Sequence, residues 1–148
     1  MKAEDILKTA ANRAGEMKLT YRGAVTPSEA YQLMTEKGAR LVDVRSRAEW
    51  DWVGRVPGSV EIELLTYPAM QPNPNFLNQL KQQVSPDSLV LFICRSGQRS
   101  HNAAAAATQA GYGSSFNVLE GFEGDKDGNN HRNSVGGWRK AGLPWVQS

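Results

Sequence analysis

The chain of 148 residues contains a single cysteine, Cys94, and no apolar run long enough to cross a membrane. One cysteine cannot form a disulfide within the chain, and a membrane helix needs roughly 18 or more apolar residues in succession. The N-terminal segment MKAEDILKTAANRAG also lacks the apolar centre of a signal peptide. These absences predict a soluble protein of a reducing compartment, most simply the cytoplasm, with no membrane partner.

The chain also has little excess of one charge over the other. The chain carries 17 basic and 15 acidic side chains, a net charge of +2, and no long basic run. This near-balance argues against a nucleic-acid partner. With 40% hydrophobic residues and neither repeats nor a linker, residues 1–148 are expected to form one domain around one core.

Short apolar runs alternate with amphipathic segments along the chain. Continuous apolar runs predict strands at 41–45, 60–62 and 89–93, with another at 116–119, and helical patterns occur at 5–14, 26–37, 76–84 and 100–110. Glycines at 15, 38 and 111 are expected to end helices, and the proline-rich segment 66–75 and the polar segment 121–137 are expected to be loops. This alternation predicts an α/β fold with a mostly parallel central sheet flanked by helices.

The lone cysteine lies in the segment LVLFICRSGQRSHNAAAAA, between the best predicted strand and a predicted helix. Ligands of open α/β sheets bind beyond the carboxyl ends of strands, where Cys94 is expected. Backbone N–H groups of the turn, the start of the helix near Ser100, and the charges of Arg95 and Arg99 all favour thiolate over thiol. Gly97 lets the turn bend. An inert buried cysteine is the simpler alternative, but two arginines and a glycine do not suit it. The pattern therefore favours a nucleophile within an anion-binding loop.

The sequence CRSGQRS after an apolar strand resembles the active-site loop of the rhodanese-type sulfurtransferases. The segments LVDVRSRAEWDWVGRVPGSVEIEL, NVLEGFEG and GWRKAGLPW are similar to other parts of that family, so the resemblance runs from about Thr26 to Trp145. It implies a rhodanese-like core over residues 26–148, preceded by a helical extension over 1–25. In the turn GRVPGS, Arg55 stands where many members have histidine.

The resemblance also implies a mechanism. Cys94 would take sulfane sulfur from a small anionic donor such as thiosulfate, hold it as a persulfide, and pass it to a thiol or to cyanide, with a protein thiol as a further acceptor. No metal and no organic cofactor are implied. The implied substrate-binding residues supply either guanidinium groups for the donor or N–H groups around the terminal sulfur; they are Arg95, Ser96, Gly97, Gln98, Arg99 and Ser100.

Two other functions remain open. Cysteine phosphatases and arsenate reductases with a rhodanese-like fold place five residues between cysteine and arginine, whereas four separate Cys94 from Arg99. A non-catalytic rhodanese-type binding module is the second alternative, although such modules usually lack the cysteine. The segment DKDGNN begins like a calcium loop but lacks the required glycine and glutamate, so a solvated loop is expected there.

Nearby polar residues are expected to support the site. Asp43, near the end of strand 41–45, should lie at the same sheet edge as Cys94 and either bond the loop or pair with an arginine. Arg45 and Glu49 are expected to pair with each other. His101 is expected on the surface of the helix after the loop.

Overall fold

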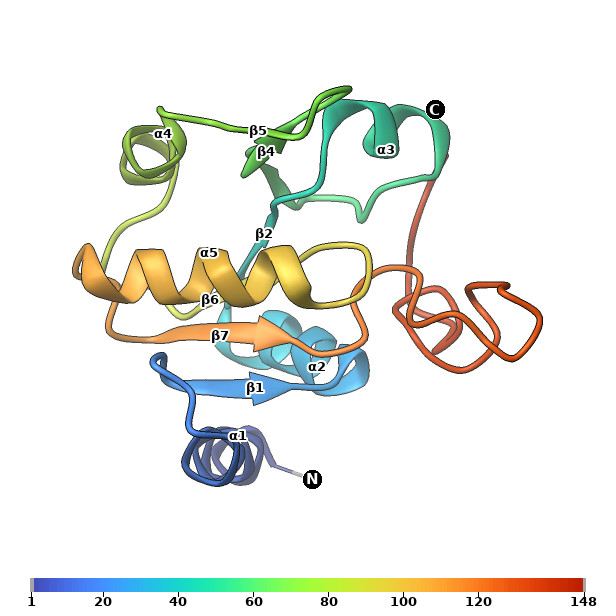
Figure 1. Ribbon diagram of the computed structural model, residues 1–148. Coiled ribbons are helices and arrows are strands. Elements are labelled where there is room, and N and C mark those ends of the chain that lie inside the picture. The colour runs from blue at the N-terminus through green and yellow to red at the C-terminus, as the bar shows by residue number, and fades with distance from the viewer. Residues whose placement is uncertain (1, 148) are drawn as a thin grey trace.

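The computed structural model describes residues 2–147 and has a five-stranded parallel sheet at its centre (Figure 1). The strands lie side by side in the order β1-β7-β6-β2-β3, and every neighbouring pair is parallel. The predicted α/β class and parallel sheet are confirmed. The strand bounds are β1 Gly23–Val25, β2 Arg40–Asp43, β3 Val60–Glu61, β6 Val90–Ile93 and β7 Ser115–Val118.

Helices cover both faces of the sheet, as Figure 1 shows for α5 on one side and α1 on the other. Apolar side chains of α1 and α2 form one core cluster with the sheet, and those of α4 and α5 form a second cluster on the opposite face, which includes Cys94. Alternate residues of each strand point to opposite faces, so each buried strand feeds both clusters. The helix bounds are α1 Ala3–Met17, α2 Pro27–Lys37, α3 Arg47–Trp52, α4 Phe76–Gln83 and α5 Gln98–Gln109.

Several helix ends follow directly from local sequence. Thr26 begins α2 with a capping box to Glu29, and Gly38 ends it in the left-handed conformation. The prediction that Gly15 ends the first helix is wrong. A glycine inside a helix costs about 1 kcal/mol, which the buried face of α1 offsets, so the helix continues to Met17 and Lys18 takes the left-handed cap.

The proline-rich segment predicted as a loop contains a small antiparallel hairpin, formed by β4 (Leu65–Thr66) and β5 (Gln71–Pro72). After β7 the described chain has turns rather than helices or strands, and a single bridge between Arg55 and Val146 joins its end to the turn after α3. Trp138, in this C-terminal segment, is fully buried. No helix within residues 2–147 is long and apolar enough to span a bilayer.

Candidate active site

Cys94 directly follows β6, the central strand of the sheet, at its carboxyl end. Gly97, with φ of 116°, is the N-cap of α5, and no described side chain caps this helix end. The helix begins at Gln98, two residues earlier than predicted, so Arg99 and Ser100 lie in its first turn. The first N–H groups of a helix have no partner within the helix, so they are available to a ligand at this end of α5.

The sulfur of Cys94 is buried among polar groups beside an open cavity. The Gly97 N–H donates to Sγ at an N···S distance of 3.1 Å, and the Ser100 hydroxyl oxygen lies 3.3 Å from Sγ. The residue is only 1% exposed, yet it lines a cavity of about 330 Å³. The other lining residues of this cavity are Leu65, Met70, Arg95, Ser96, Gln98 and Arg99. The thiol is therefore not sealed in hydrocarbon, and the cavity is large enough for a small anion.

The segment that follows β7 is hydrogen-bonded to the backbone of the Cys94 loop. The Phe122 N–H donates to the Cys94 carbonyl at 2.8 Å, and the Glu123 N–H donates to the Arg95 carbonyl at 2.9 Å. Gly121 has φ of 65°, and a Cβ placed on it would lie 2.5 Å from the Cys94 carbonyl oxygen. Only glycine permits this approach of the two backbones. The sequence does not predict this role directly, although the glycine in NVLEGFEG, beside a buried strand, is a signal for it.

Arg99 lines the cavity, but its guanidinium forms an ion pair with Glu49 of α3. Two hydrogen bonds of 2.6 and 2.9 Å join the guanidinium to the carboxylate, and both side chains are largely buried. Burial raises the pKa of Glu49, but the hydrogen bond and charge of Arg99, together with bonds from Ser46, outweigh it and lower the pKa to about 2. The expected pairing of Glu49 with Arg45 is therefore wrong, because Glu49 faces the cysteine loop fifty residues later in the chain.

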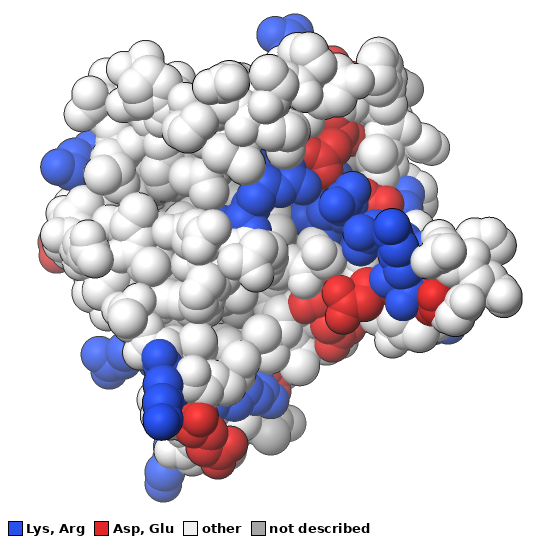
Figure 2. Space-filling model, in the orientation of Figure 1, with Lys and Arg blue, Asp and Glu red and all other residues white. Residues whose placement is uncertain are grey.

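Arg95 differs from Arg99 in having no ion pair within residues 2–147. It is exposed and lines both the Cys94 cavity and a neighbouring groove of about 510 Å³. Figure 2 shows that basic side chains form a band across this face, on the side where the strands end, with acidic side chains beside them. Within the site, Arg95 therefore contributes the positive charge that no carboxylate neutralises.

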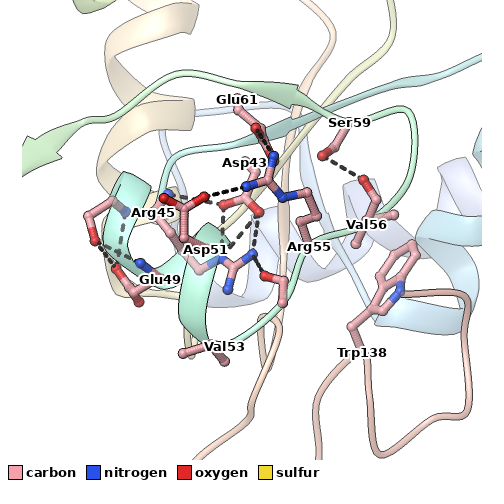
Figure 3. Close-up of polar contacts among 12 residues, drawn as sticks. Asp43, Arg45, Glu49, Asp51, Val53, Arg55, Val56, Ser59, Glu61 and Trp138 are labelled. Carbon is pink, nitrogen blue, oxygen red and sulfur yellow. Dashed lines mark hydrogen bonds and ion pairs between the residues drawn. The ribbon is translucent and has the colours of Figure 1, made fainter. Parts of the chain in front are cut away.

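Asp43 pairs with an arginine, one of the two roles expected for it. Its carboxylate accepts hydrogen bonds of 2.7 to 3.1 Å from the guanidinium and the backbone N–H of Arg45, and both side chains are fully buried (Figure 3). Arg45 also donates to the Gly54 carbonyl at 2.8 Å and stacks on the Phe122 ring, with its Cζ 4.2 Å from the ring centroid. Since Phe122 bonds the Cys94 carbonyl, this pair supports the loop rather than contacting the sulfur.

Two other sequence features lie away from the sulfur. Arg55 pairs with Asp51 at 2.8 Å and Glu61 at 3.1 Å, as Figure 3 shows. His101 is partly exposed on α5, and its Nδ1 lies 2.7 Å from the Tyr21 hydroxyl. Within residues 2–147 no three His, Cys, Asp or Glu side chains gather as a metal site would require.

Comparison with known proteins agrees with this arrangement. The rhodanese-like domain model matches residues 26–127. The crystal structure of Rv0390 from M. tuberculosis is 42% identical, with a TM-score of 0.79 over 86% of this chain and 99% of that one. The uncharacterized protein RP600 homolog of Rickettsia rickettsii is 34% identical over 82% of this chain and 94% of its own length. The thiosulfate sulfurtransferase GlpE of Actinobacillus succinogenes is 27% identical over 81% of this chain and 86% of its own length. The chain belongs to the family of rhodanese-like domains.

Proposed function

We propose that the protein is a sulfurtransferase that carries sulfane sulfur on Cys94, with thiosulfate or a similar anion as donor. The observation that supports this most is the position of the sulfur. It lies at the start of α5, receives an amide hydrogen from Gly97 at 3.1 Å, and borders a cavity that also contains the unpaired cation of Arg95. The similarity to a thiosulfate sulfurtransferase supports the same assignment.

The chemistry requires a nucleophile and an anion site but no change in overall oxidation state. The Cys94 thiolate attacks the outer sulfur of thiosulfate, a new S–S bond forms, and the original S–S bond breaks with its electron pair leaving on sulfite. An acceptor thiolate or cyanide then attacks the terminal sulfur of the persulfide, and the Cys94 thiolate leaves with the electron pair. The two half-reactions balance without a metal or an organic cofactor.

Different residues of the site serve the different steps of this reaction. Arg95 attracts the doubly charged donor, and the N-terminal dipole of α5 favours the persulfide anion. The Gly97 N–H, which already contacts the resting sulfur, holds the attacking atom in place. Arg99 is shared with Glu49, so it contributes less net charge to the donor than Arg95 does.

Steady-state assays test the proposal against its phosphatase alternative. Wild type and Cys94→Ser are assayed with thiosulfate plus cyanide and, separately, with an aryl phosphate. We expect thiocyanate formation by the wild type only, and no phosphate release by either protein. Turnover of thiosulfate by Cys94→Ser, or a Cys94-dependent phosphatase activity without sulfur transfer, would contradict the proposal.

A further inference from the structure

A buried amide beside the cysteine loop has no role in the scheme above. Asn117 lies in β7, the strand next to β6, and is only 4% exposed. Its side chain contacts the loop and the first turn of α5, on the opposite side of Cys94 from the Asp43–Arg45 pair. Asn117 is therefore hydrogen-bonded to Ser100 and Gly97, the two residues that contact the sulfur of Cys94.

The orientation of this amide follows from its neighbours. One end of the Asn117 side chain lies 3.2 Å from the Gly97 carbonyl, which can only accept a hydrogen bond, so the NH₂ group must face it. The amide oxygen therefore faces Ser100, whose hydroxyl donates to it at 2.5 Å. The opposite orientation would place two carbonyl oxygens against each other.

A serine hydroxyl has only one hydrogen. In this arrangement Ser100 gives that hydrogen to Asn117, so the 3.3 Å contact between Sγ and the hydroxyl oxygen is satisfied when Cys94 is the donor, as a thiol. The hydrogens then run in one direction, from sulfur to serine to asparagine. A thiolate keeps the Gly97 N–H, but it gains the Ser100 hydrogen only when the hydroxyl turns away from Asn117.

We propose that Asn117 is a positioning residue that acts on the nucleophile through Ser100. By holding the serine hydrogen, it favours the protonated form of Cys94 in the resting site. When the thiol proton leaves to water through the open cavity and the hydroxyl turns from Asn117 toward the sulfur, the serine hydrogen stabilises the sulfur anion. The chemical role of Cys94 rests on the proposed function, but the hydrogen-bond arrangement can be measured without any sulfur transfer.

Charged and titratable groups surround Cys94 and Asn117 on all sides, and changing Asn117 replaces none of them, although Tyr21 loses a hydrogen bond. They are Asp43 from β2, Arg45 just after it, Glu49 from α3, Arg95 from the loop, Arg99 and His101 from α5, Tyr21 before β1, and Glu120 and Asp125 after β7. Burial raises the pKa of Tyr21, and its hydrogen bond to Asn117 lowers it in part. Tyrosine absorption must therefore be separated from that of the thiolate.

The test is a pH titration of the ultraviolet absorbance of the thiolate. Since the chain has one cysteine, the matching Cys94→Ser protein supplies the baseline for each variant, tyrosine ionisation included. Asn117→Leu, which keeps the branched shape but removes the acceptor, is expected to move the midpoint lower by about one pH unit, a tenfold change in the equilibrium. Asn117→Ala is measured in parallel, so that the test can still be made with one variant if the other does not fold.

Two further comparisons separate positioning from simple structural damage. In a Ser100→Ala background, Asn117→Leu is expected to shift the midpoint no further, because its effect passes through the hydroxyl. Ser115→Ala, at a buried serine of the same strand that bonds the Tyr112 carbonyl, is expected to leave the midpoint unchanged. An unshifted midpoint in both Asn117 variants, or an equal shift in the Ser100→Ala background, would overturn the inference.

Discussion

The ion pair between Glu49 and Arg99 gives a stability that depends on pH. The substitution Glu49→Gln tests this dependence, because glutamine can still make the capping hydrogen bonds at the start of α3 but carries no charge. The pKa of Glu49 is about 2 in the folded protein, against 4.5 for the unperturbed group. At 1.36 kcal/mol for each pH unit, this difference corresponds to about 3 kcal/mol of folding free energy at neutral pH.

The direction of the pH dependence follows from the lowered pKa. This contribution is fully present above pH 4.5 and is lost as the pH falls toward 2, where the folded protein also protonates Glu49. Urea unfolding of wild type and Glu49→Gln from pH 7 to pH 2 should therefore give free energies that differ by about 3 kcal/mol at neutral pH and converge in acid. A difference that stays constant with pH would refute the reasoning.

The same substitution should also alter donor binding. Removing the carboxylate leaves the Arg99 guanidinium as a second unneutralised cation in the Cys94 cavity. We expect the KM for thiosulfate to fall roughly fivefold, about 1 kcal/mol of added attraction. Glu29→Gln is the matched control, because Glu29 pairs with Arg13 at 2.6 Å outside the site and also has a lowered pKa. It should lose stability and keep the wild-type KM.

Three other substitutions test separate parts of the structure. Gly121→Ala, with φ of 65° and no room for a Cβ, should lower the unfolding free energy by about 2 kcal/mol or more in urea, whereas Gly128→Ala, with open space around it, should not. Asp43→Asn leaves Arg45 charged in a fully buried site, so thermal unfolding should show a loss of about 3–5 kcal/mol; a loss below about 1 kcal/mol would contradict this. Arg95→Ala should raise the KM for thiosulfate roughly fivefold with unfolding unchanged, and an unchanged KM would remove Arg95 from donor binding.

Local patterns predicted much of the fold because each of them involves residues close together in the chain. The capping box at Thr26 and the continuous apolar run of β6 both depend on neighbours within a few positions. The position of Cys94 at the carboxyl end of a strand was also predictable, since the apolar run of β6 ends directly before it. The sequence predicts the start of α5 two residues late because Gly97, rather than a residue with a capping side chain, precedes the helix.

Contacts between distant segments could not be read from such patterns. Glu49 is a capping-box residue by its local spacing, and nothing near it in sequence indicates that it also neutralises Arg99. The approach of Gly121 to the Cys94 carbonyl and the bond from Ser100 to Asn117 likewise depend on the order of strands in the sheet. These three contacts determine how exposed, charged and hydrogen-bonded the sulfur is.

Intact-mass spectrometry of the purified protein after incubation with thiosulfate tests the central claim most directly. The account predicts a gain of one sulfur atom on the wild type, removed by cyanide with release of thiocyanate, and no gain on Cys94→Ser. An unmodified wild-type mass under conditions of active turnover, or an equal gain on Cys94→Ser, would contradict it.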